Sequence, residues 1–384
     1  MAEPSTETLP PLPVGDATLR DKHLLGLPAG VEHYEVEVLA ASRFRNVRWE
    51  VTGAEAATRT GLVPAVTAAL GIRAVKASAR ALRLGRAATL VGPWATTAED
   101  AVAVGLPAST TVVWVLDCPV ERGEKPWPGG DRDGLKRAFP DGMPVRGEER
   151  YLQWLVAVAR RLRGAIRTST GAVLTPDPDA ATDLTVLADH WVEPAEVLEV
   201  VQRVHAGAYL SEPDADGWRG PSSGVGRDSQ GAVGGSPEAG GSGLRAALEQ
   251  HGVADEDERR RLYAEAAAFD EHMLQNPPPS EGFGVLVDLG VDGILAVEVA
   301  AAEPQLLPPL IAELPWAADG VVAYRVRWEP FSIEEIEAEK PSFEHRVARA
   351  RSAPKIQAIA KAVHGLVGGE IADEADFLVH PDDL

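Results

Sequence analysis

The chain carries one order of sequence features twice, and this repeat constrains the fold more than any other feature. In each half a Leu-Pro pair leads into an apolar run, and an amphipathic stretch then reaches a glycine, two short apolar runs and a Pro-Asp pair. We therefore predict two related units at about residues 88–179 and 283–384, each with the order strand-helix-strand-helix-strand-strand. Chance similarity of short amphipathic elements is the alternative. The matched features are Leu106-Pro107 with Leu314-Pro315, 112–116 with 321–326, Ala157-Val158-Ala159-Arg160 with Ala358-Ile359-Ala360-Lys361, Gly164 with Gly365, and Pro176-Asp177 with Pro381-Asp382.

A segment of about residues 212–243 separates the two repeats, and Gly, Ser, Pro and Asp dominate it. Such a segment buries too little apolar surface to offset its ordering entropy, so we predict a flexible Gly/Ser/Pro linker. On this basis residues 31–211 form an N-terminal α/β domain. Residues 244–384 form an acidic C-terminal α/β domain with a leading helical segment. Residues 1–30, which contain Pro10-Pro11-Leu12-Pro13, are expected to be a loose N-terminal segment.

Hydrophobic periodicity predicts an α+β fold in mixed α/β layers for both domains. Strands are expected where apolar residues alternate or run together, and helices where they recur every three to four residues. The predicted strands include 34–39, 111–116, 184–191, 283–288, 293–300 and 321–328, and the predicted helices include 62–84, 148–163, 194–204, 304–314 and a helix within 343–364 that is bent or broken before Pro354.

Charge and composition exclude several classes of protein. The formal net charge of −21 repels nucleic acid and anionic membranes at long range, so direct nucleic-acid binding is not expected. The single cysteine, Cys118, can form neither an internal disulfide nor a thiolate-rich metal site, which fits a reducing compartment. No apolar run approaches the ~20 residues of a membrane span, and the start of the chain lacks a basic region followed by an apolar core. We therefore expect a cytoplasmic protein that does not contact a membrane.

No motif in the sequence carries recognisable chemistry, so we predict no catalytic residue, cofactor or metal site. The run Gly220-Pro221-Ser222-Ser223-Gly224 matches a nucleophile elbow in letters only, because neither a strand nor a helix flanks it. Cys118 follows a predicted core strand, where a buried apolar role is expected and no histidine should lie within hydrogen-bond reach. The nine histidines are scattered, the acidic runs lack calcium-loop spacing, and no phosphate-binding glycine loop occurs.

A basic stripe is the one charge pattern that supports a hypothesis. Arg73, Lys76, Arg80 and Arg83 are spaced i, i+3, i+7 and i+10 on a predicted helix, and Arg86 follows. No acidic residue occurs from residue 56 to 98. The stripe either binds an external anion, such as a phosphate, a nucleotide or a nucleic acid, or docks against the acidic C-terminal domain. We favour docking, because a tethered acidic domain has a high effective concentration.

Trp127 is a second candidate, because it lies in a predicted loop, Lys125-Pro126-Trp127-Pro128-Gly129-Gly130. A packed loop anchor is the first expectation, and an exposed tryptophan that binds a protein partner is the alternative.

These observations favour a non-enzymatic, cytoplasmic, protein-binding or regulatory protein built from a duplicated α/β unit. One alternative is an enzyme or sensor that binds a phosphorylated small molecule or nucleotide through the basic helix. Another is an acidic mimic of nucleic acid that blocks a DNA-binding partner.

Overall fold

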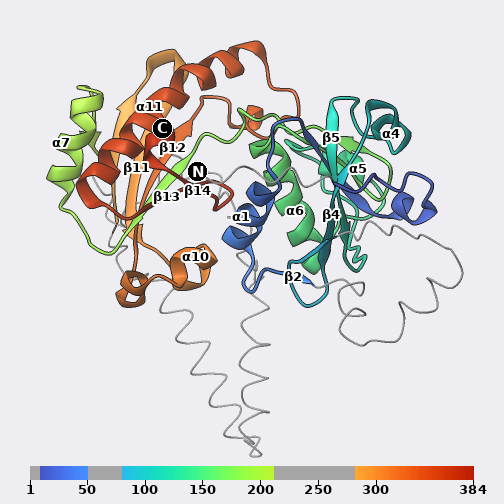
Figure 1. Cartoon of the computed structure of the whole chain (residues 1–384). Coiled ribbons are helices and arrows are strands. Elements are labelled where there is room, and N and C mark those ends of the chain that lie inside the picture. The colour runs from blue at the N-terminus through green and yellow to red at the C-terminus, as the bar shows by residue number, and fades with distance from the viewer. Residues whose placement is uncertain (1–8, 51–79, 212–281) are drawn as a thin grey trace, which may run out of the picture.

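A computed structural model of the chain describes residues 9–50, 80–211 and 282–384 (Figure 1). The described residues form two units that lie side by side, each built on one seven-stranded antiparallel sheet. The fold is therefore α+β in two units, as predicted. The predicted linker at 212–243 and the helical segment that begins at 244 lie outside the described residues.

The first unit has the strand order β2-β3-β4-β5-β1-β6-β7. Helices α1 and α6 pack on one face of this sheet, and the shorter α4 packs on the other face with Leu12 and Leu19 from the start of the chain. The elements are η1 (Ala17–Asp21), β1 (His23–Pro28), α1 (His33–Arg43), β2 (Arg48–Glu50), β3 (Ala81–Arg83), β4 (Thr89–Ala95), α4 (Ala98–Ala103), β5 (Thr110–Asp117), α5 (Leu135–Ala138), α6 (Arg146–Arg161), β6 (Ala165–Arg167) and β7 (Val173–Leu174).

The second unit has the order β9-β10-β11-β12-β8-β13-β14. Helices α7 and α11 pack on one face and α10 on the other. The elements are β8 (Leu184–Ala188), α7 (Pro194–Val204), β9 (Tyr209–Leu210), β10 (Phe283–Asp288), η2 (Gly290–Asp292), β11 (Ile294–Ala301), η3 (Pro304–Leu306), α10 (Pro309–Ala312), η4 (Pro315–Asp319), β12 (Val322–Glu329), η5 (Ile333–Glu335), α11 (Phe343–Val367), β13 (Glu370–Asp373), β14 (Leu378–Val379) and η6 (Pro381–Asp383).

The two sheets have the same topology, because their strands occur in the same spatial order. Strand β1 corresponds to β8, β2 to β9, and so on to β7, which corresponds to β14. The register also agrees: Leu25 pairs with Trp114 and Ile166, and Val186 pairs with Tyr324 and Ile371. The predicted pair of related units is confirmed, although each unit begins earlier than predicted, at β1 and at β8. Ile166 and Ile371 are 371 − 166 = 205 residues apart, whereas the matched helical stretches begin 358 − 157 = 201 apart. The helices therefore match about one turn away from the predicted alignment.

Four sequence expectations require correction. Residues 23–28 are not part of a loose segment, because β1 pairs with both β5 and β6. The boundary at residue 211 does not separate the sheets, because β8 pairs with β12 and β13, and β9 with β10. The polypeptide crosses from one sheet to the other between β7 and β8.

The third correction concerns residues 34–39, which belong to helix α1 instead of a strand. Val36, Leu39 and Ala40 are buried at helical spacing, and Glu32 and Glu35 form a capping box at the start of the helix. Helix α11 is not broken before Pro354, because it continues through this residue to Val367.

Candidate functional site: a groove between the two units

The main candidate site is a groove of about 740 Å³ at the junction of the two units. Its size falls in the range of small-ligand and peptide sites. The end of α6 comes from the first unit, the crossing segment 177–184 joins the units, and α11 with the 373–384 segment comes from the second. The side chains that line it include Ala157, Arg160, Arg161, Asp177, Asp179, Leu184, Arg346, Arg349, Ala350, Ala353, Pro354, Gln357, Asp373, Ala375 and Asp383.

Two of the groove arginines have close anionic partners. Arg349 lies 2.6 Å from the carboxylate of Asp177. Burial, the largest single effect, would raise the pKa of Asp177, but the hydrogen bonds from Arg349 and the Asp179 N–H, together with the charges of Arg349 and Arg160, lower this pKa overall. Arg160 lies 2.5 Å from Asp133 and 3.6 Å from Glu374. These arginines are structural, because their charges are already neutralised.

The other two groove arginines are much less engaged. Arg346 is exposed, and within the part of the chain that the structure describes its guanidinium has no ion pair or hydrogen bond. Arg161 makes a single ion pair of 3.9 Å, with Asp373. That carboxylate already accepts the backbone N–H groups of Ala375 and Phe377, and burial raises its pKa. The groove therefore contains two cationic groups that are available to an incoming anion.

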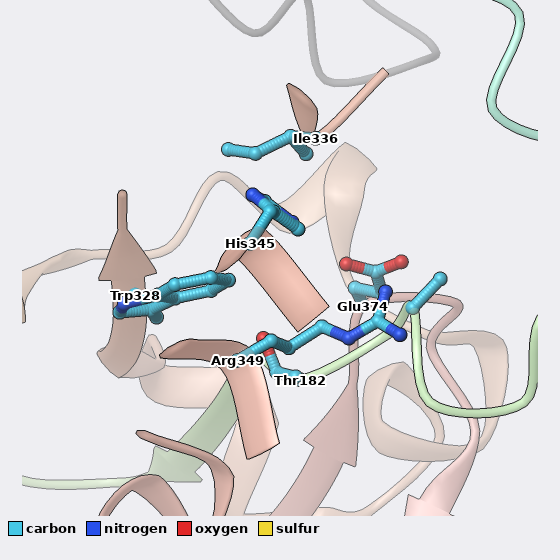
Figure 2. Close-up of a pocket in the computed structure, with 7 residues that line it drawn as sticks. Thr182, Trp328, Ile336, His345, Arg349 and Glu374 are labelled. Atoms are coloured by element: carbon cyan, nitrogen blue, oxygen red, sulfur yellow. The ribbon is translucent and has the colours of Figure 1, made fainter. Parts of the chain in front are cut away.

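A much smaller cavity of about 10 Å³ adjoins the groove and shares Thr182 and Arg349 with it (Figure 2). Figure 2 shows the His345 ring beside Trp328, and their ring centres are 5.1 Å apart. The His345 ring is buried, and its Nδ1 has no hydrogen-bond partner among the residues that the structure describes. Burial and the nearby Arg349 lower the pKa of His345. This volume is about that of one water molecule, so the cavity is too small for an organic ligand.

A buried polar network lies inside the first unit. His23 Nε2 is 3.0 Å from a carboxylate oxygen of Glu148, and both side chains are buried. Glu148 also accepts the N–H of Glu121 at 2.7 Å and pairs with Arg122, while the N–H of Ser169 donates to His23 Nδ1. Burial, with Arg122 close by, lowers the pKa of His23 to about 4. His23 is therefore neutral near pH 7, and both of its ring nitrogens are engaged.

Cys118 follows β5 and is half-buried, whereas we expected it to be substantially buried. Burial and the adjacent Asp117 raise the pKa of its thiol to about 11. A nucleophilic cysteine requires the opposite shift. No histidine hydrogen bond to Cys118 occurs among the described residues, and they contain no group of three metal-ligating side chains either.

The described residues of the basic stripe, from Arg80 onwards, do not form the predicted helical face. Arg73 and Lys76 lie outside the described residues, but Ala81–Arg83 is strand β3, which pairs with β2 and β4. Arg83 lies 2.5 Å from Glu50 and donates to the carbonyl oxygen of Arg86, and Arg80 lies over the Trp49 ring at 5.5 Å. Arg80 and Arg83 therefore contact residues of their own unit.

Other arginines of the first unit make the contacts with acidic residues of the second. Most of these acids lie in or beside the β13–β14 turn, and we call this set of pairs the ionic seam. The seam comprises Arg43 with Asp376, Arg132 with Glu374 at 2.9 Å, Arg137 with Glu339 at 2.7 Å, Arg160 with Glu374 at 3.6 Å and Arg161 with Asp373 at 3.9 Å. These arginines are scattered between residues 43 and 161, so no local sequence pattern indicates them.

Trp127 is 77% exposed, so it is not the packed loop anchor that we expected first. Its loop contacts the second unit, because the N–H of Asp131 donates to the carbonyl oxygen of Glu337 at 2.8 Å. The segment that contains Glu337 also carries Phe331 and Phe343, which are 75% and 68% exposed. Three large aromatic side chains are therefore exposed on segments that meet at the seam, with Trp127 and Phe331 on loops and Phe343 at the start of α11.

Comparisons with known proteins find no matching family model, no similar curated protein and no similar solved structure. Within the ranges that the structure describes, no helix has the length and apolar character needed to cross a membrane.

Proposed function

We propose that this is a non-enzymatic protein that acts by binding another protein, in the cytoplasm. The observation that carries the proposal is the exposure of Trp127, Phe331 and Phe343 on the two segments joined at the seam, 125–131 and 331–343. Large aromatic side chains supply much of the binding energy at protein interfaces, so three exposed ones near one junction favour a protein-binding role. The unreactive states of Cys118 and His23 give no support to a catalytic alternative.

Capture from a native lysate with a reversible cross-linker tests this proposal. The full chain is compared with Trp127→Ala combined with Phe331→Ala, and with Val291→Ala as the matched control. Val291 is 83% exposed and lies in η2, away from the two segments in sequence. We expect one specific protein to be retained by the native chain and the control, and lost with the double variant. Retention by all three proteins, or by none, would contradict the proposal.

A further inference from the structure

One face of α11 runs along the groove. The groove residues of this helix are 346, 349, 350, 353, 354 and 357, a spacing that keeps them on a single face. From Arg346 to Gln357 the helix rises about 16 Å, which is the length of about five residues of extended chain. The opposite face of α11, which includes Ile356, Ile359 and Val363, is buried on the sheet. The groove is thus elongated along a helix that is fixed from behind.

The middle of this face is shallow. Ala350, Ala353 and Pro354 present few side-chain atoms, so a second polypeptide backbone can approach the helix closely. The part of the groove lined by described residues has no aromatic side chain on which a nucleotide base could stack. A peptide in extended conformation suits this shape better than a flat cofactor.

Charge then selects among peptides. Arg346 has no side-chain partner in the described ranges, and Arg161 approaches the groove from the other unit with one long ion pair. An arginine can grip a carboxylate with two parallel hydrogen bonds. Asp179 and Asp383 also line the groove and would repel an acidic side chain placed beside them. Acidic residues are therefore favoured only at the positions that face the two arginines.

We infer that the groove binds an extended peptide segment of the partner protein, with acidic side chains of that segment paired to Arg346 and Arg161. This inference rests on the proposed protein-binding function and adds the chemistry of the segment that is recognised. Such a segment contacts both units at once, so its binding also favours their docked arrangement.

Selection from a random octapeptide library displayed on phage, with the full chain as target, tests the inference. We expect enriched peptides to share an Asp or Glu at a fixed position. The most enriched peptide is then measured by fluorescence anisotropy against Arg346→Glu combined with Arg161→Glu. We expect the double variant to bind this peptide at least tenfold more weakly than the native chain does. A peptide in which Asn or Gln replaces the shared Asp or Glu should lose the same affinity for the native chain.

The matched control is Arg351→Glu, because Arg351 lies on α11 outside the groove and pairs with Asp292. It should change the affinity less than twofold. If circular dichroism shows that the double variant is unfolded, Arg346→Gln replaces it. Three outcomes would each overturn the inference: no enrichment, enriched peptides without acidic residues, and peptides that bind the charge-reversed protein as well as the native one. Peptides that copy this chain would indicate self-association and would also overturn it.

The experiments distinguish a failure of the peptide-groove inference from a failure of the protein-binding proposal. Capture of a partner that depends on Trp127 but not on Arg346 and Arg161 would retain the protein-binding proposal and remove only the groove as its peptide site.

Discussion

The two units share a strand order and a register, yet matched positions hold different chemistry. His23 in the first unit pairs across the sheet with Leu116, and the equivalent Leu184 in the second pairs with Val326. The first unit therefore surrounds this position with a buried ionic network, whereas the second leaves a leucine at the edge of the groove. This topology therefore requires apolar alternation along the strands but no buried charge. The network in the first unit is an addition that makes that unit sensitive to substitution and to pH.

Glu148→Ala should lower the free energy of unfolding more than the substitutions of His23 and Tyr324 described below. It removes the buried carboxylate that accepts hydrogen bonds from His23 and from the Glu121 N–H and pairs with Arg122, and each buried donor left unpaired costs about 1–3 kcal/mol of unfolding free energy. Urea denaturation measures the loss. Glu149→Ala is the matched control, because Glu149 is the next residue and is exposed, and it should cost no more than about 0.5 kcal/mol. Equal effects of the two substitutions would show that the network does not stabilise the first unit.

Acidification should weaken the first unit through the protonation of His23. The folded-state pKa of His23 is about 4, against 6.5 for an ordinary histidine, so the unfolded chain binds this proton first. Stability is fully present above pH 6.5 and falls as the pH drops towards 4, by about 3 kcal/mol in total. Urea midpoints between pH 4 and 7 measure the slope. His23→Gln should flatten it, whereas His380→Gln, on an exposed residue, should not. An unchanged slope in His23→Gln would contradict the assignment.

Tyr324→Phe tests the second unit at the position equivalent to Trp114. The Tyr324 hydroxyl accepts the N–H of Val192 and donates to the carbonyl oxygen of His190, both at 3.0 Å. Losing it leaves buried groups unpaired and should cost about 1–3 kcal/mol. Hydrogen exchange should show the loss in β8 and β12 and spare β1 and β5. Loss of protection in both sheets would mean that the two units unfold as one.

The sequence predicts the fold class well, because its strongest signals are long and periodic. Strand 111–116, helix 148–163 and helix 194–204 are found close to their predicted bounds. Helix α1 is missed because Tyr34 to Leu39 alternates in polarity while its buried residues also fit a helix. The unit boundary is misplaced because β9 has only two residues and pairs with β10, beyond the predicted linker.

The candidate site is less predictable. Trp127 is identifiable because a tryptophan between prolines and glycines is conspicuous in a loop. The groove is not, because its walls come from α6, α11 and the 373–384 segment, which only the tertiary fold brings together. The sequence carries one signal for the groove. Arg346, Ala350, Ala353 and Gln357 lie on one face of a helix, with polar residues at its ends and small residues in its middle. Which arginines of the seam and groove are paired depends on long-range contacts that no local pattern encodes.

The two like units dock through the ionic seam, with Phe377 of the second unit buried in the core of the first, and this docking forms the groove. The direct test is the distance between spin labels at Val102→Cys and Val291→Cys in a Cys118→Ser background, because both positions are exposed and lie in different units. The native seam is compared with Arg132→Glu combined with Arg137→Glu, at low salt and at about 1 M salt, where exposed charges are screened within ~3 Å. We expect one narrow distance for the native seam at low salt and broad distributions in the other three samples, with circular dichroism unchanged. Identical narrow distributions in all four samples would contradict the claim.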